Sequence, residues 1–137
     1  MPSSQQASAV IPMLICRDGA AEIDFCVGSF GAVELSRRAA SDGAVIHATL
    51  HIAGALFMVH GETELLRSRA PAVDGSSSVV IYLYVQDVDA SVKRALDHGA
   101  RLELAVADQL WGDRVGRIVD PSGHVWNVAS HIQRASA

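Results

Sequence analysis

Two histidines in the first half of the chain have the spacing of a side-chain pair that could bind a metal ion or transfer protons. Ala53 and Gly54 are typical of a two-residue hairpin turn between apolar strands, predicted over residues 45–52 and 55–60. A ladder starting at this turn places His47 opposite His60, and opposed side chains on one face lie about 4.5–5.5 Å apart at Cβ. We expect the imidazoles to lie side by side, either as metal ligands or acid–base groups, or as a hydrogen-bonded pair without a catalytic task.

The same ladder sets Thr49 opposite Met58. Residues 46, 48, 50 and 52 are apolar, which indicates the face that packs against a helix. Because strand side chains alternate between faces, Thr49 and Met58 should join the two histidines on the other face, which would line a cleft. His51 lies four residues from His47, a separation of about 13 Å, so it is too distant to join the pair.

The second half contains further candidates. Tyr82 and Tyr84 alternate along an apolar strand predicted over residues 79–85, where they could stack on a planar ligand or pack in a dimer interface. Trp111, Asp113 and Arg114 lie in one loop. Arg114 is suited to binding a carboxylate or phosphonate in bidentate fashion. Alternatively, Asp113 and Arg114 form an ion pair that shapes the loop.

Two similar units must position these residues. Asp18 and Asp87 are each followed by a helical pattern and a closing glycine, and they lie 69 residues apart, as do the turn glycines Gly54 and Gly123. The order of predicted elements is βαβββ, a connector, and βαβββ again. The predicted buried helix stripes are Ile23, Cys26, Val27 and Phe30, then Val88, Val92, Ala95 and Leu96.

These patterns predict the organisation of the chain. The expected segments are a disordered tail over residues 1–9, a first module over 10–61, a connector over 62–77, a second module over 78–131 and a tail over 132–137. Because one βαβββ unit cannot cover both sheet faces, the modules should pack together or against another subunit.

Several motifs resemble one family over residues 10–131. They are AAEIDFCVGSFGA, YLYVQDVDA and, above all, the segment WGDRVGRIVDPSGHVW, whose Asp-Pro-Ser-Gly turn joins two predicted strands. Together they resemble the glyoxalase/bleomycin-resistance/dioxygenase group, the vicinal oxygen chelate superfamily, and most closely its branch linked to phosphonate operons. The resemblance implies an α+β fold of two tandem βαβββ modules, with a curved mixed sheet, a cleft and helices on the outer face.

The resemblance also implies where a metal would bind. Metal-using members carry His, Glu or Gln on the first and fourth strands of each module, and the matching residues here are Ile11, Met58, Val80 and Asn127. Only Asn127 offers a hard oxygen, so these four residues do not form a divalent metal site, and we expect no cofactor. We expect Asn127 to be a ligand-binding residue of the cleft instead.

Composition excludes other classes of function. The net charge is −4 and no basic run occurs, which argues against nucleic-acid binding. No apolar stretch is long enough to span a membrane, and the polar N-terminus is unlike a secretory signal, so a cytoplasmic location is expected. Cys16 and Cys26 are expected to be buried thiols. His124 follows a turn and is expected to be exposed, and His98 lies at a helix end.

The sequence therefore predicts a metal-independent protein that binds a small molecule, forms a homodimer and sequesters an antibiotic or aromatic metabolite. The alternative is a lyase, isomerase or dioxygenase of the same superfamily with an altered metal site. A third interpretation is a partner-binding protein whose cleft is filled by its own side chains. The sequence specifies neither the ligand nor a reaction.

Overall fold

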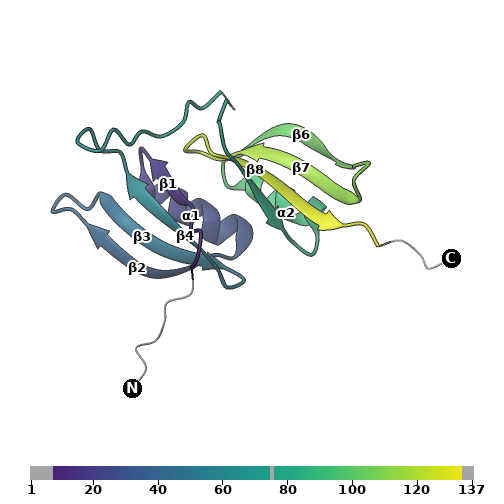
Figure 1. Cartoon of the computed structure of the whole chain (residues 1–137), viewed down its shortest axis with the longest axis horizontal. Coiled ribbons are helices and arrows are strands. Elements are labelled where there is room, and N and C mark those ends of the chain that lie inside the picture. The colour runs from purple at the N-terminus through teal and green to yellow at the C-terminus, as the bar shows by residue number, and fades with distance from the viewer. Residues whose placement is uncertain (1–7, 75, 134–137) are drawn as a thin grey trace, which may run out of the picture.

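The computed structural model describes residues 8–74 and 76–133, which form two successive βαβββ modules (Figure 1). The predicted α+β fold is confirmed. The first module comprises β1 (Met13–Cys16), α1 (Gly19–Phe30), β2 (Val33–Ala39), β3 (Val45–Ile52) and β4 (Ala55–Gly61). The second comprises β5 (Val80–Tyr84), α2 (Val88–Asp97), β6 (Arg101–Asp108), β7 (Asp113–Val119) and β8 (Val125–His131).

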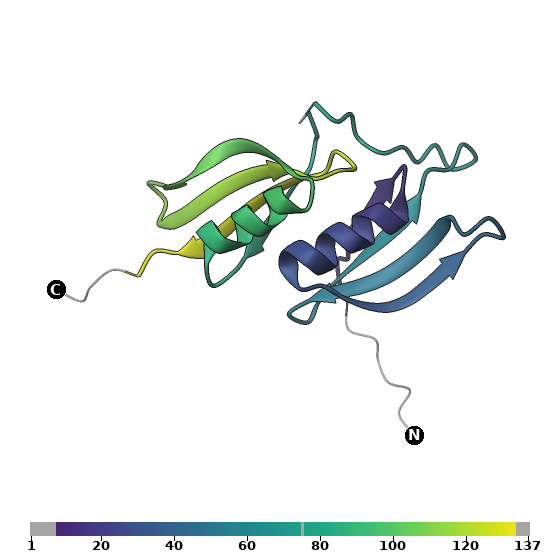
Figure 2. The same cartoon turned by 180° about the vertical axis from the view of Figure 1, so that it is seen from behind.

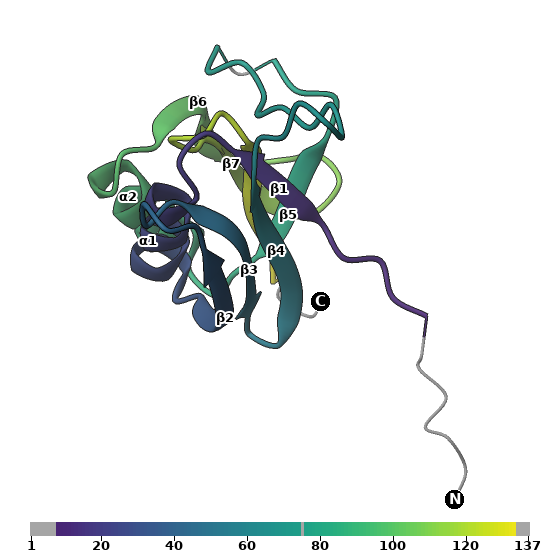
Figure 3. The same cartoon turned by 90° about the vertical axis from the view of Figure 1, so that its left-hand side faces the viewer.

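Each module builds one four-stranded mixed sheet. The strand orders are β1-β4-β3-β2 and β5-β8-β7-β6, with the outer pairs β1–β4 and β5–β8 parallel and the other pairs antiparallel. Both helices lie on the same side of the two sheets and pack against each other (Figure 2). Viewed from the side, the helices lie on one side and the strands on the other, so each sheet has one face that no helix covers (Figure 3). We call these uncovered surfaces the open faces.

The proposed segment boundaries can be placed against the strands. The first module's strands begin at Met13, three residues after the predicted start, and end at Gly61. Those of the second run from Val80 to His131. The predicted tails fall largely on residues 1–7 and 134–137, which lie outside the described part of the chain. No helix in residues 8–74 and 76–133 is long and apolar enough to cross a membrane.

The helix caps are as predicted, and the buried stripes are confirmed except at Val27 and Leu96. Asp18 and Asp87 each accept a hydrogen bond from a first-turn backbone N–H at 3.1 Å. Val27 and Leu96, which were predicted to be buried, are 44% and 37% exposed. In α1 the buried residues also include Glu22, Phe25 and Ser29, because α1 packs against α2 and, at Glu22, against the Asp120–Gly123 turn as well as against its own sheet. Periodicity located the helices but not the direction of this second contact.

The two helices approach closely at Gly28. A Cβ at this position would lie 2.4 Å from the His98 imidazole, so the absence of a side chain lets α2 approach. The His98 ring is held by a 2.7 Å hydrogen bond between its Nδ1 and the carbonyl oxygen of Arg94. Arg94 in turn donates through Nε to the carbonyl oxygen of Ser29 at 3.4 Å. The helix interface therefore joins the two modules through polar as well as apolar contacts.

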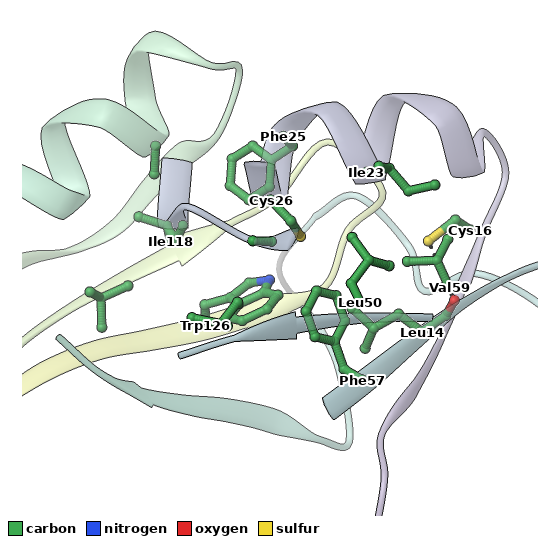
Figure 4. Packing of buried hydrophobic residues seen from close by; sticks show 14 of the residues in the cluster. Leu14, Cys16, Ile23, Phe25, Cys26, Leu50, Phe57, Val59, Ile118 and Trp126 are labelled. Carbon is green, nitrogen blue, oxygen red and sulfur yellow. Dashed lines mark hydrogen bonds between the residues drawn. The ribbon is translucent and has the colours of Figure 1, made fainter. Parts of the chain in front are cut away.

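An aromatic cluster at the centre of the core also joins the modules (Figure 4). Trp126 of β8 is 2% exposed, and its ring centroid lies 5.0 Å from that of Phe30 and 6.4 Å from that of Phe57. The indole Nε1 donates to Asp120 Oδ2 at 2.9 Å, which satisfies its polar atom inside the core. Residues of α1, β4 and β8 thus meet around one indole ring.

The turn before β8 has the predicted geometry. Asp120 Oδ1 accepts hydrogen bonds from the backbone N–H groups of Ser122 and His124 at 3.0 and 2.9 Å, and Gly123 has a φ of +95°. His124 differs from its prediction: it is half-buried, with Nε2 2.8 Å from the carbonyl oxygen of Ile15 in β1. The turn therefore also links the two modules, which a local pattern could not indicate.

The connector packs against this turn. Arg17 donates to the carbonyl oxygens of Ser122, at 3.2 Å, and of Pro71. A Cβ at Gly123 would lie 2.8 Å from the Ala72 carbonyl oxygen, so a side chain there would displace the connector backbone. Glycine is needed at position 123 for both its positive φ and this close approach.

Candidate functional site

The predicted histidine pair is present on the open face of the first module. The register pairs His47 with His60 and Thr49 with Met58, and the two Nδ1 atoms lie 3.2 Å apart. All four side chains are half-buried. Burial lowers the pKa of His47, and the nearby imidazole of His60 and guanidinium of Arg38 lower it further. At neutral pH the Nδ1–Nδ1 contact is therefore a hydrogen bond in which one ring donates.

We predict that the pKa of His47 lies below its ordinary value of 6.5 and that His60→Gln raises it part of the way back. The recovery is partial because the variant removes the charge of His60 but leaves the larger effect of burial. Titration of the imidazole signals by NMR measures both values. His51→Gln is the control, since His51 is engaged at the turn by the Gly54 backbone N–H. A pKa of His47 that does not respond to His60→Gln would contradict this account.

A hydrogen-bonded network occupies the open face of the second module. Asp113 is 3% exposed, and its Oδ2 accepts hydrogen bonds from the hydroxyls of Tyr82 and Tyr84 at 2.6 and 2.8 Å. These donors stabilise the carboxylate and lower the pKa of Asp113. The same contact raises the pKa of Tyr84 to about 12, whereas for Tyr82 burial is the larger cause and the bond to Asp113 adds to it. Both phenols therefore stay protonated at neutral pH.

His131 and Trp111 complete this network. His131 Nδ1 lies 3.0 Å from Asp113 Oδ1, and its ring stacks on Tyr84 with centroids 4.4 Å apart. Trp111 Nε1 donates to the Tyr82 hydroxyl at 3.1 Å. The rings nevertheless remain accessible, because Tyr82, Tyr84 and Trp111 are 41%, 50% and 65% exposed. We call these three rings the aromatic surface.

The structure places Arg114 away from the aromatic surface. Its guanidinium binds both carboxylate oxygens of Asp89 in α2, at 2.9 and 3.0 Å, and Asp108 at 3.0 Å. These bonds raise the pKa of Arg114 and keep it charged. The predicted alternative of an ion pair between Asp113 and Arg114 is wrong, because consecutive strand residues point to opposite faces. Arg114 links β7 to α2 and to β6 on the helix-covered face of the sheet. Its guanidinium already binds two carboxylates.

Asn127 lies at the centre of the second open face, but the positively charged side chain of Arg117 lies beside it. Asn127 Oδ1 accepts from Arg117 Nε at 2.7 Å, and the register aligns Tyr82, Asn127 and Arg117 across three neighbouring strands. A guanidinium at this distance would repel a divalent metal. Ile11 and Val80 offer no donor atoms, so the residues at the family's metal positions do not fit a hard metal ion. Nor do the described residues contain any group of three His, Cys, Asp or Glu side chains able to hold one.

A groove lies between β5 on one side and the segment leading into β1 and the β3–β4 hairpin on the other. It has a volume of about 430 Å³ and is mostly apolar, within the usual range of small-molecule sites. Tyr82 belongs both to this groove and to the network on the open face, so the aromatic surface adjoins the groove. The lining includes Val10, Ile11, Leu56, Phe57, Ile81 and Tyr82.

Sequence reasoning missed the partners of Asp113 and Asn127, although a signal was present. The Asp120–Gly123 turn pairs Val119 with Val125, and continuing this ladder places Arg117 opposite Asn127 and Asp113 opposite His131. Counting along the ladder from the Ala53–Gly54 turn had placed His47 opposite His60 in the same way. The contacts of Tyr82 and Tyr84 with Asp113 depend instead on how β5 joins the sheet beside β8, which no turn specifies.

Comparisons with known proteins place the chain in a family. The Glyoxalase/Bleomycin resistance protein/Dioxygenase superfamily model matches residues 10–128. An uncharacterised protein of Mycobacterium bovis is 41% identical over 131 residues, covering 93% of this chain and 86% of the relative.

Solved structures share the fold. TioX from Micromonospora sp. ML1 is 27% identical with a TM-score of 0.72, over 92% of this chain and all of that one. FosX from Listeria monocytogenes, described as a fosfomycin resistance protein, has a TM-score of 0.68 at 16% identity over 92% of this chain and 94% of that one. That likeness concerns the fold alone. The resemblance to the phosphonate-operon branch stays a prediction. The family-model match over most of the chain shows that this protein belongs to the glyoxalase/bleomycin resistance protein/dioxygenase superfamily.

Proposed function

We propose that this chain binds a small planar aromatic molecule on the aromatic surface, without a metal at the family's usual position, and thereby sequesters it. The observation that carries the proposal is that Tyr82, Tyr84 and Trp111 are exposed yet held in position by hydrogen bonds: both tyrosines donate to Asp113, and Trp111 donates to Tyr82. Fixed rings lose little conformational entropy when a ligand stacks on them. The adjoining apolar groove provides room for the rest of the ligand.

Arg117 indicates what polar group the ligand carries. Its Nε is bound to Asn127, and no carboxylate in the described residues forms an ion pair with it. The two terminal nitrogens can therefore donate to a carboxylate or phosphonate of a ligand lying beside Tyr82. An aromatic acid combines the two requirements.

Tryptophan fluorescence tests this proposal, because the two tryptophans differ in accessibility. Trp111 is 65% exposed and Trp126 is 2% exposed, so a ligand stacked on the aromatic surface changes chiefly the emission of Trp111. We expect 2-naphthoate to produce a saturable change that Trp111→Phe removes. Arg117→Gln should weaken binding of naphthoate about tenfold or more and leave binding of the uncharged 2-naphthalenemethanol unchanged.

Binding measured by calorimetry with the same two compounds can contradict the proposal in two ways. Binding that persists unchanged in a Tyr82→Ala, Trp111→Ala double variant would exclude the aromatic surface as the site. Equal loss of both ligands in Arg117→Gln would exclude Arg117 as the anion contact.

The histidine pair favours a second candidate, an enzyme with an altered metal site. A metal ion about 2.0–2.1 Å from both Nδ1 atoms, which lie 3.2 Å apart, would make an N–metal–N angle of roughly 100°, close to tetrahedral. Calorimetric titration with zinc tests it: stoichiometric binding that His60→Gln abolishes would favour this candidate, and no binding would remove it.

We also propose a homodimer. Half-exposed apolar side chains on the edge strands β2 and β6 give a second copy an apolar surface to cover, and light scattering in solution should return twice the chain mass. These side chains are Val33, Leu35, Leu102 and Leu104.

A further inference from the structure

Asp113 and His131 face each other at one end of the second module's open face. They are direct partners in the antiparallel register of β7 and β8, so the backbone fixes their side chains on one face at short range. The 3.0 Å contact between Asp113 Oδ1 and His131 Nδ1 follows from this pairing. The ring of His131 also stacks on Tyr84, which restricts its rotation.

The hydrogen bonds determine which ring nitrogen carries the proton. Asp113 accepts from two tyrosine hydroxyls, which stabilise its ionised form, and an ionised carboxylate can only accept hydrogen bonds. The hydrogen in the contact with His131 must therefore lie on Nδ1. In the neutral ring Nε2 then keeps its lone pair, and the side chain of His131 is 77% exposed.

This arrangement distinguishes His131 from the other histidines. None of the other five makes a side-chain contact with a carboxylate in the described residues. Their ring nitrogens contact another histidine or the backbone, as given above for His47, His51, His60, His98 and His124. The groups that face His131 are Asp113 on β7 and the phenol of Tyr84 on β5, while Arg114 lies on the opposite face of the sheet.

We propose that Asp113 and His131 form a general-base dyad and that this chain catalyses proton transfer on the ligand bound at the aromatic surface. The inference rests on the proposed function, since the stacked ligand must lie beside Tyr84 for Nε2 to reach it. Asp113 acts as a positioning residue: it fixes the tautomer and stabilises the imidazolium that forms, a role that a buried carboxylate beside a histidine is suited to fill.

The step needs no reactant besides the ligand and solvent water. Nε2 of His131 takes a proton from an acidic C–H of the ligand, the C–H bonding pair remains on the ligand, and the new positive charge lies beside the Asp113 carboxylate. Return of the proton to another ligand atom gives an isomerisation, and loss of a leaving group from the ligand gives an elimination. In the second case water removes the proton and restores neutral His131.

The probe for this activity is 5-nitrobenzisoxazole, a planar aromatic compound that opens to a coloured phenolate when a base removes its C–H proton. We expect wild-type protein to accelerate the opening beyond free imidazole at equal concentration. His131→Gln should lower kcat by about 100-fold with KM little changed, because glutamine can still donate to Asp113 but has no basic nitrogen. His51→Gln, a histidine of the first module without a carboxylate partner, should match wild type. A wild-type rate no higher than imidazole, or an unaffected His131→Gln, would overturn the proposal.

Two further measurements separate failure of the dyad from failure of binding. Trp111→Ala should raise KM while leaving kcat largely intact, so unchanged KM would count against the aromatic surface and not against the dyad. The nitrogen signals of His131 in NMR should show the Nδ1–H tautomer in wild type and lose this preference in Asp113→Asn. An Nε2–H tautomer in wild type would overturn the dyad even if ligands bind.

Discussion

Replacing Trp126 by alanine will lower the free energy of unfolding by about 3–5 kcal/mol, which for a chain of this length lowers Tm by roughly 10–17 °C. Trp126 is 2% exposed and contacts Phe30 of α1 and Phe57 of β4. Its removal leaves a cavity where the modules meet and strips Asp120 Oδ2 of its indole donor. Chemical denaturation followed by circular dichroism measures the loss.

The chain supplies its own matched control for this substitution. Trp111 is 65% exposed and makes one hydrogen bond, to Tyr82, so Trp111→Ala should cost about 1 kcal/mol or less. The same residue change at the two positions therefore separates core packing from the chemistry of the side chain. Similar losses in both variants would contradict the assignment of Trp126 as the central packing residue.

The second large effect concerns pH and the buried carboxyl of Glu22. This residue on α1 is fully buried, with Oε2 3.8 Å from Cys26 Sγ and Oε1 without a partner among the described residues. Burial raises the pKa of Glu22 well above its ordinary value of 4.5, and the neighbouring carboxyl of Asp120 raises it further. We expect Glu22 to stay protonated in the folded protein at pH values where the unfolded chain has ionised it.

The sign of the effect follows from this shift. Between pH 4.5 and the raised pKa, the folded state holds a proton that the unfolded state has released, so the free energy of unfolding falls as pH rises. Glu22→Gln keeps the neutral shape without the ionisation. The difference between variant and wild type should therefore grow in favour of the variant as pH rises from 5 toward the raised pKa, by up to about 1.4 kcal/mol per pH unit.

Comparison of variant with wild type removes the contribution of other groups. The lowered pKa of His47 adds stability as pH rises toward 6.5, and the raised pKa values of the buried thiols act only above pH 9. Asp24→Asn is the control, because Asp24 lies at an exposed position of the same helix. Denaturant titrations at each pH supply the profiles. A Glu22→Gln profile parallel to that of wild type would show that Glu22 is ionised in the fold.

Local sequence signals predicted the elements that a turn or a cap defines. The Ala53–Gly54 turn fixed the register that brings His47 to His60, and the Asp120–Gly123 turn and the Asp18 and Asp87 caps have the expected geometry. Such signals act between residues a few positions apart, so they depend little on the rest of the fold.

The candidate site was only partly predictable. Tyr82, Tyr84 and Trp111 were recognised as ligand-binding candidates, and the structure brings them together. Arg114, chosen for its chemistry, is occupied by Asp89 and Asp108 on the other face, while Arg117 and His131 were not among the predicted ligand-binding residues. Whether an arginine is available to a ligand depends on which carboxylates surround it, and those belong to other elements.

The sequence by itself determined two βαβββ modules, their hairpin registers and the unsuitability of the residues at the family's metal positions, because these follow from periodicity, turn chemistry and side-chain type. Only the tertiary structure decided that Asp113 gathers two tyrosines and a histidine, that Glu22 is buried beside Asp120, and that Trp126 joins the modules. These contacts join residues up to 98 positions apart, from Glu22 to Asp120. The stability of these contacts depends on burial and on charges that several separate segments contribute together. No local sequence pattern can therefore specify them.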